Sequence, residues 1–543
     1  METILASAFG IKPNQDISQA LEKALLHLKT IPGEKTLVFE PGTYTLSAAL
    51  CKKHLLYITN TAGDEEYKED ETPHLAAVGF YLGGMEDLTI DGGGAIFMIN
   101  GKMTPIALED CRNITLKNFE IRHRHPDMHE FRICGVNLFS VDFELDSDSL
   151  YTVENGKLYF YGDDYRVRAD KDAATAFWIG RIRQNTPQQV RRTAHPLALS
   201  RRVEDRGNGR IRVHSLHTAR FRPGDRYYVY DVRRQFVGIF INRSKDIQLK
   251  NLAQRFNYSL ALVAQDSENL SLLRLTFAPE ADAARKIASC ADFMQFCMCR
   301  GQILVRDSLF DGAGDDCLNV HGIHFKITKV EGKKLTVRFM HPQTHGFNPL
   351  RVGDAIAFIH PETLLEFGRA TIEETELVGE YEIRLRVDSA KDAIAGAVIE
   401  DITACPDLLF QNNTLTRIIT RGLLITTRGR VLVENNRFVS TTMSGILLSD
   451  DAKSWYESGM CQNVTIRGNR FESCGEPPIL ILPENSRHAG AVHKNITISG
   501  NVFENVQKVA VSAKSTDMLT LENNRLEKGE LLQTKNCTNL ALR

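Results

Sequence analysis

The chain has no run of apolar residues that approaches the roughly 18 consecutive positions needed for a membrane-spanning helix. Its first residues, METILASAFGIKPNQD, lack the basic segment followed by an apolar one that marks a secretory leader. It also has no excess charge of one sign, because 66 basic and 68 acidic side chains leave a formal charge of −2. These absences argue against a membrane protein and against a protein that gathers nucleic acid on a positive surface.

Cysteine has no regular spacing, and the eleven residues are an odd number scattered over 543 positions. This usage favours reduced thiols over a disulfide framework, so we expect a cytoplasmic protein. Apolar residues make up 43% and charged residues 25% of the chain. These are ordinary values for a folded protein and do not support intrinsic disorder or collagen-like structure.

A short repeat runs through the chain, in which alternating apolar residues are followed by Asn and a further apolar residue. Leu249 and Leu272 occupy equivalent positions 23 residues apart, as do Ile498 and Leu521, whereas Val433 and Ile466 are 33 apart. Single strands at this period, with no amphipathic helices between them, predict a parallel β-helix. We expect the recurrent Asn at tight corners, where it tolerates left-handed backbone and can form amide ladders. The copies are NITLKNFEI, DIQLKNLAQ, NLSLLRLTF, VLVENNRFV, NVTIRGNRF, NITISGNVF and LTLENNRLE.

The ends and interruptions of the repeat predict the remaining architecture. Helical spacing of apolar residues near the start predicts a helix that caps the solenoid, at Ile17, Leu21, Ala24, Leu25 and Leu28. Two strand-rich regions without the repeat predict inserted β-modules, and PGDRYYVYD and VGDAIAFIH in them suit the turn-plus-strand units of small barrels. The expected fold is all-β: a right-handed parallel β-helix with an N-terminal capping helix and two barrel-like insertions.

This organisation divides the chain into five segments. We expect the cap and first coils in residues 1–125, an inserted β-module in 126–235, coils that carry the candidate site in 236–322, a barrel-like module in 323–400 and C-terminal coils in 401–543. Insertions on a solenoid commonly form walls around a binding face.

The stretch between Cys290 and Gly322 contains the most informative acidic residues. Asp292 and Asp315 are 23 residues apart, so we expect them on successive coils of one face. Strand alternation places Leu318 and Val320 inside the coil and a polar row outside it, consisting of Asp315, Cys317, Asn319 and His321.

Asp316 has the inward parity and reaches the same face only if GAGDD forms a bulge or bend, for which Gly312 and Gly314 provide conformational freedom. Clustered carboxylates repel one another, so one of them holds its proton while others ionise, which supplies an acid and a base for glycoside hydrolysis. Two alternatives remain: an acidic turn without function, and a calcium site, although no spaced ligand series accompanies these oxygens.

Several segments together resemble a known family. ADFMQF, followed one coil later by GDDCLNVHG, is similar to the active-site region of glycoside hydrolase family 110, the α-1,3-galactosidases with a right-handed β-helix and β-barrel insertions. RGLLITTRG, SDDAKSWYESG and NVTIRGNRF are also similar to that family, and the similarity runs from about Leu252 to the C-terminus. The chain resembles the polygalacturonases more distantly.

The resemblance implies an exo-acting, inverting hydrolase that releases terminal α-1,3-linked galactose from linear or blood-group-B-like glycans. It matches Asp315 with the general acid and Asp292 and Asp316 with the pair that holds and activates water. It implies no cofactor and no metal. The histidines His123, His125 and His129 also match no standard zinc spacing, and we expect them in a loop that borders the cleft.

Further residues are candidates for binding the sugar. Asn319 and His321 lie on the expected outer row and could hydrogen-bond hydroxyl groups. Trp455, one of only two tryptophans, could stack on a pyranose face, although packing under a loop explains it equally well. Glu457 could bind hydroxyl groups, and Arg421 could reach the cleft from the end of a strand.

Two other functions compete with the galactosidase. A polygalacturonase-like hydrolase of acidic glycans needs Lys or Arg beside the acids, and the outer row of GDDCLNVHG offers neither. A non-catalytic β-helix protein that binds carbohydrate is the alternative from another class, because a fold does not specify a function. The expected partner is a galactose-terminated oligosaccharide, without nucleic acid or membrane, and a homodimer is a possible assembly.

Overall fold

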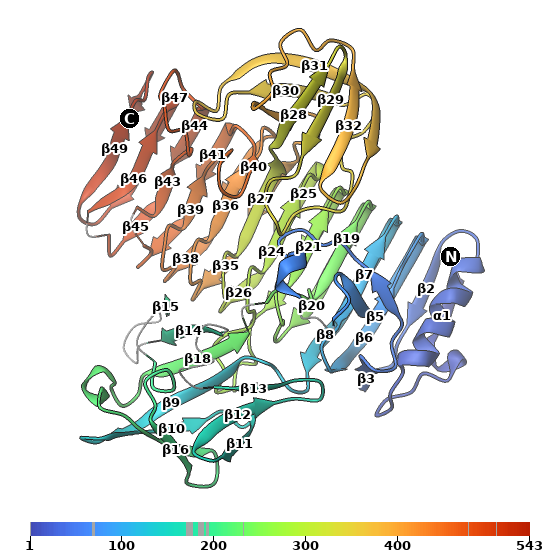
Figure 1. Cartoon of the computed structure of the whole chain (residues 1–543), viewed down its shortest axis with the longest axis vertical. Coiled ribbons are helices and arrows are strands. Elements are labelled where there is room, and N and C mark those ends of the chain that lie inside the picture. The colour runs from blue at the N-terminus through green and yellow to red at the C-terminus, as the bar shows by residue number, and fades with distance from the viewer. Residues whose placement is uncertain are drawn as a thin grey trace.

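The computed structural model describes residues 2–67, 71–169, 177–182, 189–191, 195–231, 233–475, 477–506 and 508–543. It is a parallel β-helix that runs from α1 (Ser18–Thr30) at one end to β49 (Glu530–Lys535) at the other, with one inserted module on each side of it in Figure 1. No helix within the described residues has both the length and the apolar character needed to cross a bilayer. No disulfide bond joins cysteines in this part of the chain.

Two long sheets form the faces of the β-helix. The smaller sheet, which carries the site described below, is parallel apart from its first strand pair and consists of β4 (Lys53–Leu55), β5 (Leu75–Tyr81), β7 (Thr104–Glu109), β19 (Ile239–Asn242), β21 (Leu262–Gln265), β24 (Met294–Cys297), β27 (Leu318–Ile323), β36 (Leu423–Thr426), β39 (Ile446–Leu448), β43 (Ile479–Ile481), β46 (Val509–Lys514) and β49.

The larger sheet contributes one or two strands to each coil. Its longer strands are β2 (Lys35–Val38), β6 (Glu86–Asn100), β8 (Arg112–His123), β20 (Lys245–Gln254), β22 (Glu268–Leu273), β25 (Arg300–Arg306), β34 (Asp407–Gln411), β37 (Val431–Glu434), β41 (Gln462–Arg467), β44 (His493–Ser499) and β47 (Thr516–Glu522). Its short strands are β1 (Glu2–Leu5), β3 (Thr43–Ser47), β23 (Thr276–Phe277), β26 (Leu309–Asp311), β35 (Thr414–Thr416), β38 (Arg437–Val439), β42 (Arg470–Glu472), β45 (Val502–Glu504), β48 (Arg525–Leu526) and β50 (Ala541–Leu542).

The register of these strands confirms the repeat. Leu249 lies beside Leu272, Val433 beside Ile466, and Ile498 beside Leu521. All of these side chains are buried in one continuous apolar core that fills the coils. Because side chains alternate between the two faces of a strand, the apolar positions of each repeat lie inside and its polar positions lie outside.

The recurrent asparagines occupy the corners, as expected. Asn435 has left-handed backbone with φ of 55°, and the next residue, Asn436, is buried. The Asn436 side chain receives a hydrogen bond from the Asn413 amide at 3.2 Å and donates one to Asn469 at 3.0 Å. This ladder continues through Asn501 and Asn524. Stacked amides therefore satisfy the polar groups of a buried corner.

The first turns of the chain cap the open end of the solenoid. The apolar face of α1 is buried against the core through Leu21, Ala24, Leu25 and Leu28. This confirms the predicted capping helix. Without such a cover, the first coil would expose its interior and its edge strands to solvent.

The second insertion is a closed barrel with its own apolar core. Its strands are β28 (Phe325–Glu331), β29 (Lys334–Arg338), β30 (Ala355–Ile359), β31 (Glu366–Leu377), β32 (Glu382–Val387) and β33 (Val398–Asp401). In Figure 1 it projects from the β-helix beside β27.

The first insertion forms two antiparallel sheets in the described residues, rather than a closed barrel. The strands are β9 (His129–Val136), β10 (Ser140–Leu145), β14 (Phe177–Ile182), β15 (Gln189–Arg191), β16 (Arg202–Asp205), β17 (Arg210–His214) and β18 (Arg226–Asp231), with β11 (Leu150–Glu154), β12 (Lys157–Tyr161) and β13 (Arg166–Arg168) in the smaller sheet. Gly224 before β18 and Gly353 before β30 both have left-handed backbone, which confirms the matching turns of the two insertions.

The histidines near the start of the first insertion do not form the expected loop. His123 ends β8 and His129 begins β9, and both are buried. The ring of His129 stacks on Phe160 with centroids 3.9 Å apart. The prediction of a loop beside the cleft was therefore wrong for these two residues, which pack inside the structure.

Candidate active site

The predicted acidic cluster lies in one cleft on the outer side of β24, β27 and β36. Asp292 precedes β24, whereas Asp315 and Asp316 lie in the bend before β27. All of them line the cleft. The cleft is completed by Arg421, Asn319, Asp451, Trp455, Glu457, Glu484, Asn60 and Arg234, together with smaller side chains of the same loops.

The bend before β27 turns Asp316 into the cleft. Gly312 has left-handed backbone with φ of 82°. A Cβ on Gly314 would meet the carbonyl oxygen of Ser289 at 2.5 Å, so only glycine allows this close approach. The predicted bend is confirmed, and its main consequence is that alternation along the strand does not apply to the two aspartates.

Two details of the predicted outer row were wrong. Cys317 faces the apolar core and is fully buried, because the chain leaves the bend one residue later than simple alternation requires. The register pairs Met294 with Leu318, an offset of 24 residues, so Asp292 aligns with Asp316 rather than with Asp315. Asp315 instead hydrogen-bonds through its backbone N–H to Ala291, at 3.2 Å.

Asp316 is held by a cation from the next coil. Its two carboxylate oxygens accept hydrogen bonds from Nε and Nη2 of Arg421, at 2.9 Å and 2.6 Å. The backbone N–H of Arg421 and the hydroxyl of Thr420 also donate to it. A buried carboxylate with this many donors is stabilised in its ionised form and has a fixed orientation.

Asp315 is held by a cation from a different part of the chain. Nη2 of Arg234 donates to Oδ2 of Asp315 at 2.7 Å, and Nη1 of the same side chain donates to Asn60 at 2.9 Å. Arg234 lies between the first insertion and β19, and Asn60 lies in the loop after β4. Nothing in the repeat or in any motif predicted these two residues, which reach the cleft only through the folding of the insertions.

Asp292 is the carboxyl group of the cluster that retains a proton most readily. Burial raises its pKa well above the usual range, and the negative charges of Asp315 and Asp316 raise it further. The positive charges of Arg234 and Arg421 oppose this shift but do not cancel it. The cleft therefore contains a protonated carboxyl beside carboxylates paired with arginine, which is the charge pattern required for acid and base catalysis.

The loop after β39 forms the opposite wall of the cleft. Asp451 accepts hydrogen bonds from the backbone N–H groups of Lys453 and Trp455, at 2.8 Å and 2.6 Å. Burial would raise the pKa of Asp451, but these donors and the Ser454 hydroxyl outweigh burial and lower it. Asp451 thus shapes the loop as an ionised carboxylate, and it extends the acidic set beyond the residues that the sequence indicated.

The candidate sugar-binding residues converge on the same region. Asn319 projects from β27 and donates a hydrogen bond to Glu457 at 2.9 Å. The Asn319 side-chain oxygen is buried without a partner, so it is available to a ligand hydroxyl. His321 lies behind this pair, in an adjoining hollow, with its ring 2.9 Å from the amide of Gln295.

Trp455 lies at the mouth of the cleft. Its side chain is 47% exposed, and its ring stacks on His341 with centroids 4.3 Å apart. Burial lowers the pKa of His341 to about 4, so the stacked imidazole is neutral near pH 7. An exposed aromatic ring that is held in one orientation offers a flat apolar face to a sugar.

Comparison with known proteins agrees with this geometry. Residues 334–393 match the model of the GLAA-B beta-barrel domain II, and residues 395–526 match the model of a right-handed beta helix region. An alpha-1,3-galactosidase A of Bacteroides thetaiotaomicron is 34% identical over 554 residues, which cover 98% of this chain and 94% of that protein. The chain belongs to the α-1,3-galactosidase family of glycoside hydrolases.

Other similar proteins carry the same or a related name. An alpha-1,3-galactosidase B of Phocaeicola vulgatus is 30% identical over 550 residues and covers 95% of this chain and 88% of that protein. Among solved structures, the Yersinia enterocolitica family 28 exopolygalacturonase aligns with a TM-score of 0.41 and 10% identity, over 99% of this chain and 78% of that chain. Family membership therefore rests on the galactosidases.

Proposed function

We propose that this protein is an exo-acting, inverting α-1,3-galactosidase that uses Asp292, Asp315 and Asp316. The convergence of the aspartates in one cleft, with a raised pKa at Asp292 and an arginine at each of the others, is the observation that carries the proposal. Hydrolysis with inversion needs one group that protonates the leaving oxygen and another that activates water. The relatives named α-1,3-galactosidases support the linkage.

The proposed acid is Asp315. Its side chain is 14% exposed, whereas that of Asp316 is 2% exposed, so Asp315 can reach a leaving oxygen in the open part of the cleft. The ion pair with Arg234 favours ionised Asp315, and the proton lies on Asp292 before substrate binds. In our proposal the bound glycan draws this proton to Asp315, because protons in a coupled cluster belong to the cluster as a whole.

The proposed water-holding pair is Asp292 and Asp316. The strand register places them side by side on adjacent coils. Arg421 keeps Asp316 ionised and fixes its orientation, so Asp316 can accept a proton from water while Asp292 supplies a second contact. After the reaction Asp315 is ionised, and Arg234 stabilises that product charge.

Exo action is supported by what surrounds the cleft. Asn60, Arg234 and the loop that carries Trp455 lie around the aspartates, so the face of the β-helix is not an open groove at this point. A single terminal sugar could enter such a cleft, with Asn319 and Glu457 toward its hydroxyl groups and Trp455 at the mouth.

An acidic-glycan hydrolase is less well supported. The outer row of β27 lacks a cation, but Arg234 and Arg421 enter the cleft from other segments, so the sequence argument against a uronate was incomplete. Both of these arginines bind aspartates of the site, and a uronate carboxylate would compete with those ion pairs. The cations of the cleft are thus better explained as partners of the aspartates.

The acid assignment can be tested with a substrate whose leaving group needs no proton. Asp315→Asn should reduce hydrolysis of galactosyl-α-1,3-galactose by about 1,000-fold, within the range for loss of a general acid. The same variant should retain hydrolysis of α-galactosyl fluoride, because fluoride leaves without protonation.

The control variant for this test is Asp316→Asn, which should lose both activities because it lacks the base. Equal losses on the two substrates for Asp315→Asn, in a protein shown to be folded, would contradict the assignment. No release of galactose by the wild-type protein would contradict the proposed function, and a polygalacturonate assay would then test the alternative.

A further inference from the structure

A cluster of two histidines and one aspartate joins the N-terminal segment to the barrel. Asp64 lies in η2 (Asp64–Glu66), His74 lies just before β5, and His345 lies between β29 and β30. One potential ligand atom from each residue lies within 4.8 Å of the others. Oδ1 of Asp64 is 2.7 Å from Nε2 of His74 and 3.3 Å from Nε2 of His345. Three segments distant in sequence therefore direct metal-binding atoms at one point.

The histidines carry buried nitrogen atoms without hydrogen-bond partners. His345 is 4% exposed, and neither of its ring nitrogens makes a hydrogen bond, although Nε2 faces Asp64. Nδ1 of His74, which is 7% exposed, also lacks a partner. Buried polar atoms in native proteins nearly always have a partner, so an exception calls for an ion or water at that place.

The residues around the cluster fix the orientation of its members. Oδ2 of Asp64 accepts a hydrogen bond from the Tyr381 hydroxyl at 2.9 Å, which leaves Oδ1 toward the histidines. The ring of His345 stacks on Tyr381 at 4.2 Å, and the ring of His74 stacks on Tyr57 at 4.4 Å. Such surrounding contacts orient metal ligands and reduce the entropy lost on binding.

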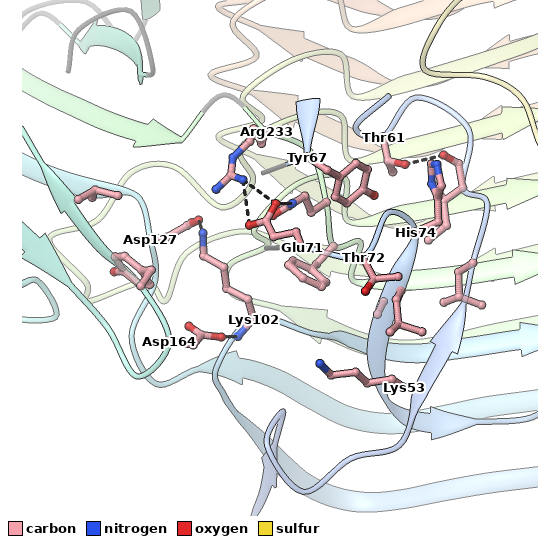
Figure 2. A pocket seen from close by; sticks show the side chains of 18 of the residues that line it. Lys53, Thr61, Tyr67, Glu71, Thr72, His74, Lys102, Asp127, Asp164 and Arg233 are labelled. Atoms are coloured by element: carbon pink, nitrogen blue, oxygen red, sulfur yellow. Dashed lines mark hydrogen bonds and ion pairs between the residues drawn. The ribbon is translucent and has the colours of Figure 1, made fainter. Parts of the chain in front are cut away.

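A path for a cation leads to the cluster from the neighbouring pocket. This pocket, of about 410 Å³, lies between the N-terminal segment and the first insertion, and His74 forms part of its wall. Figure 2 shows His74 on one side of the pocket, with the pair of Arg233 and Glu71 and the pair of Lys102 and Asp127 further along it. The cluster is thus buried but accessible to small ions.

We propose that Asp64, His74 and His345 bind a divalent transition-metal ion, most suitably Zn²⁺, and so fasten the N-terminal segment to the barrel. Imidazole nitrogens with one carboxylate oxygen form a common zinc ligand set, whereas Ca²⁺ and Mg²⁺ prefer oxygen ligands. The protein supplies three ligands, and a water molecule from the pocket completes a tetrahedral site.

The metal site is connected to the cleft by a short chain of contacts. Beside His345, Thr344 hydrogen-bonds to Thr59 at 2.9 Å, and the carbonyl of Gln343 accepts from the backbone of Asn60 at 2.7 Å. Asn60 in turn binds Arg234, the partner of Asp315. Zn²⁺ therefore acts as a positioning ion for this wall, a consequence that rests on the proposed function, whereas metal binding does not.

Titration calorimetry with ZnCl₂ on the full chain, without a histidine tag and after chelation, tests the site. The wild-type protein should bind one equivalent, and bound Co²⁺ should give the visible absorption of a tetrahedral site. Asp64→Asn keeps the shape of the side chain but loses the anionic ligand, and with His345→Ala it should weaken binding by about 100-fold or more. The matched control His360→Ala removes an exposed barrel histidine that stacks on Phe367 and should bind as the wild type does.

Thermal unfolding gives a second measurement that does not depend on activity. Added ZnCl₂ should raise the Tm of the wild-type protein and of His360→Ala but not that of Asp64→Asn. Absence of stoichiometric binding in the folded wild-type protein, or equal affinity in Asp64→Asn, would overturn the proposal. Zinc binding by a protein that releases no galactose would support the metal site and contradict the proposed function.

Discussion

The two adjacent aspartates of the cleft are held by walls of different origin. Asp316 is bound by Arg421, which belongs to the next coil of the same solenoid. Asp315 is bound by Arg234, which follows an insertion and is braced by Asn60 from the N-terminal segment. The coil wall is built by a repeat that also builds the core, whereas the inserted wall depends on the docking of separate segments. Neighbouring residues can therefore differ in how strongly the fold constrains them.

Asp292 senses both walls, and its replacement should have the largest effect. Asp292→Asn should reduce galactose release by about 1,000-fold because one carboxyl of the catalytic set is lost. The same variant should be more stable than the wild type at pH 7. Burial raises the pKa of Asp292, so between the unfolded pKa near 4 and the folded pKa the native state holds more protons, and the free energy of unfolding falls as pH rises.

Thermal unfolding across pH checks this prediction. The Tm of Asp292→Asn should exceed that of the wild type by roughly a few degrees at pH 7, and the difference should close as pH falls to about 3, where the wild-type carboxyl is protonated in both states. A variant that is less stable than the wild type at pH 7 would show that Asp292 is not held as a strained, protonated group.

Loss of the coil wall should reduce both activity and stability. Arg421→Gln leaves Asp316 buried without its cation, so we expect a loss of at least about 100-fold in kcat and about 3 kcal/mol in the free energy of unfolding. The matched control is Arg417→Gln, which breaks the ion pair with Asp311 on the same coil away from the cleft. It should lose stability but keep kcat, and a loss of kcat similar to that of Arg421→Gln would remove the special role of Arg421.

Loss of the inserted wall should affect mainly catalysis and its pH dependence. Arg234→Gln should lower kcat by about 10-fold to 100-fold, because Asp315 loses its partner. Arg234 lowers the pKa of Asp292, so its removal should move the alkaline limb of kcat/KM to higher pH. The adjacent Arg233→Gln, which instead breaks a pair with Glu71, is the control and should leave that limb in place. A shift to lower pH in Arg234→Gln would contradict the assigned charges.

The mouth of the cleft should show the smallest effect. Trp455→Ala should raise KM by about 3-fold to 10-fold, as expected for the loss of one aromatic contact, with kcat and Tm little changed. Trp455→Phe keeps an aromatic face and should stay close to the wild type. An unchanged KM in Trp455→Ala would show that the ring only packs on His341.

The same division explains what could be predicted from the sequence. The repeat encodes its own register, so the pairs Leu249 with Leu272 and Val433 with Ile466 were found before the structure was known. Asp292 and Asp315 were found because acidic residues on a solenoid face interrupt that pattern. The direction of Cys317 was predicted wrongly, because one residue gained in a bend reverses the alternation.

Residues outside the repeat could be predicted only in part. Arg234 and Asn60 follow no period and no motif, and their contribution depends on how distant segments pack. Asp451 and Glu484 carry a signal that was available, since each follows a strand of the same face on successive coils. The sequence thus specified the coil wall well and the inserted wall hardly at all.

Proton NMR during hydrolysis of galactosyl-α-1,3-galactose tests the central claim most directly, because it reports which galactose anomer forms before mutarotation. The proposed mechanism predicts that β-galactose appears first, since water attacks from the face opposite the leaving group. Initial α-galactose would leave the galactosidase in place but contradict inversion and the roles given to Asp292, Asp315 and Asp316.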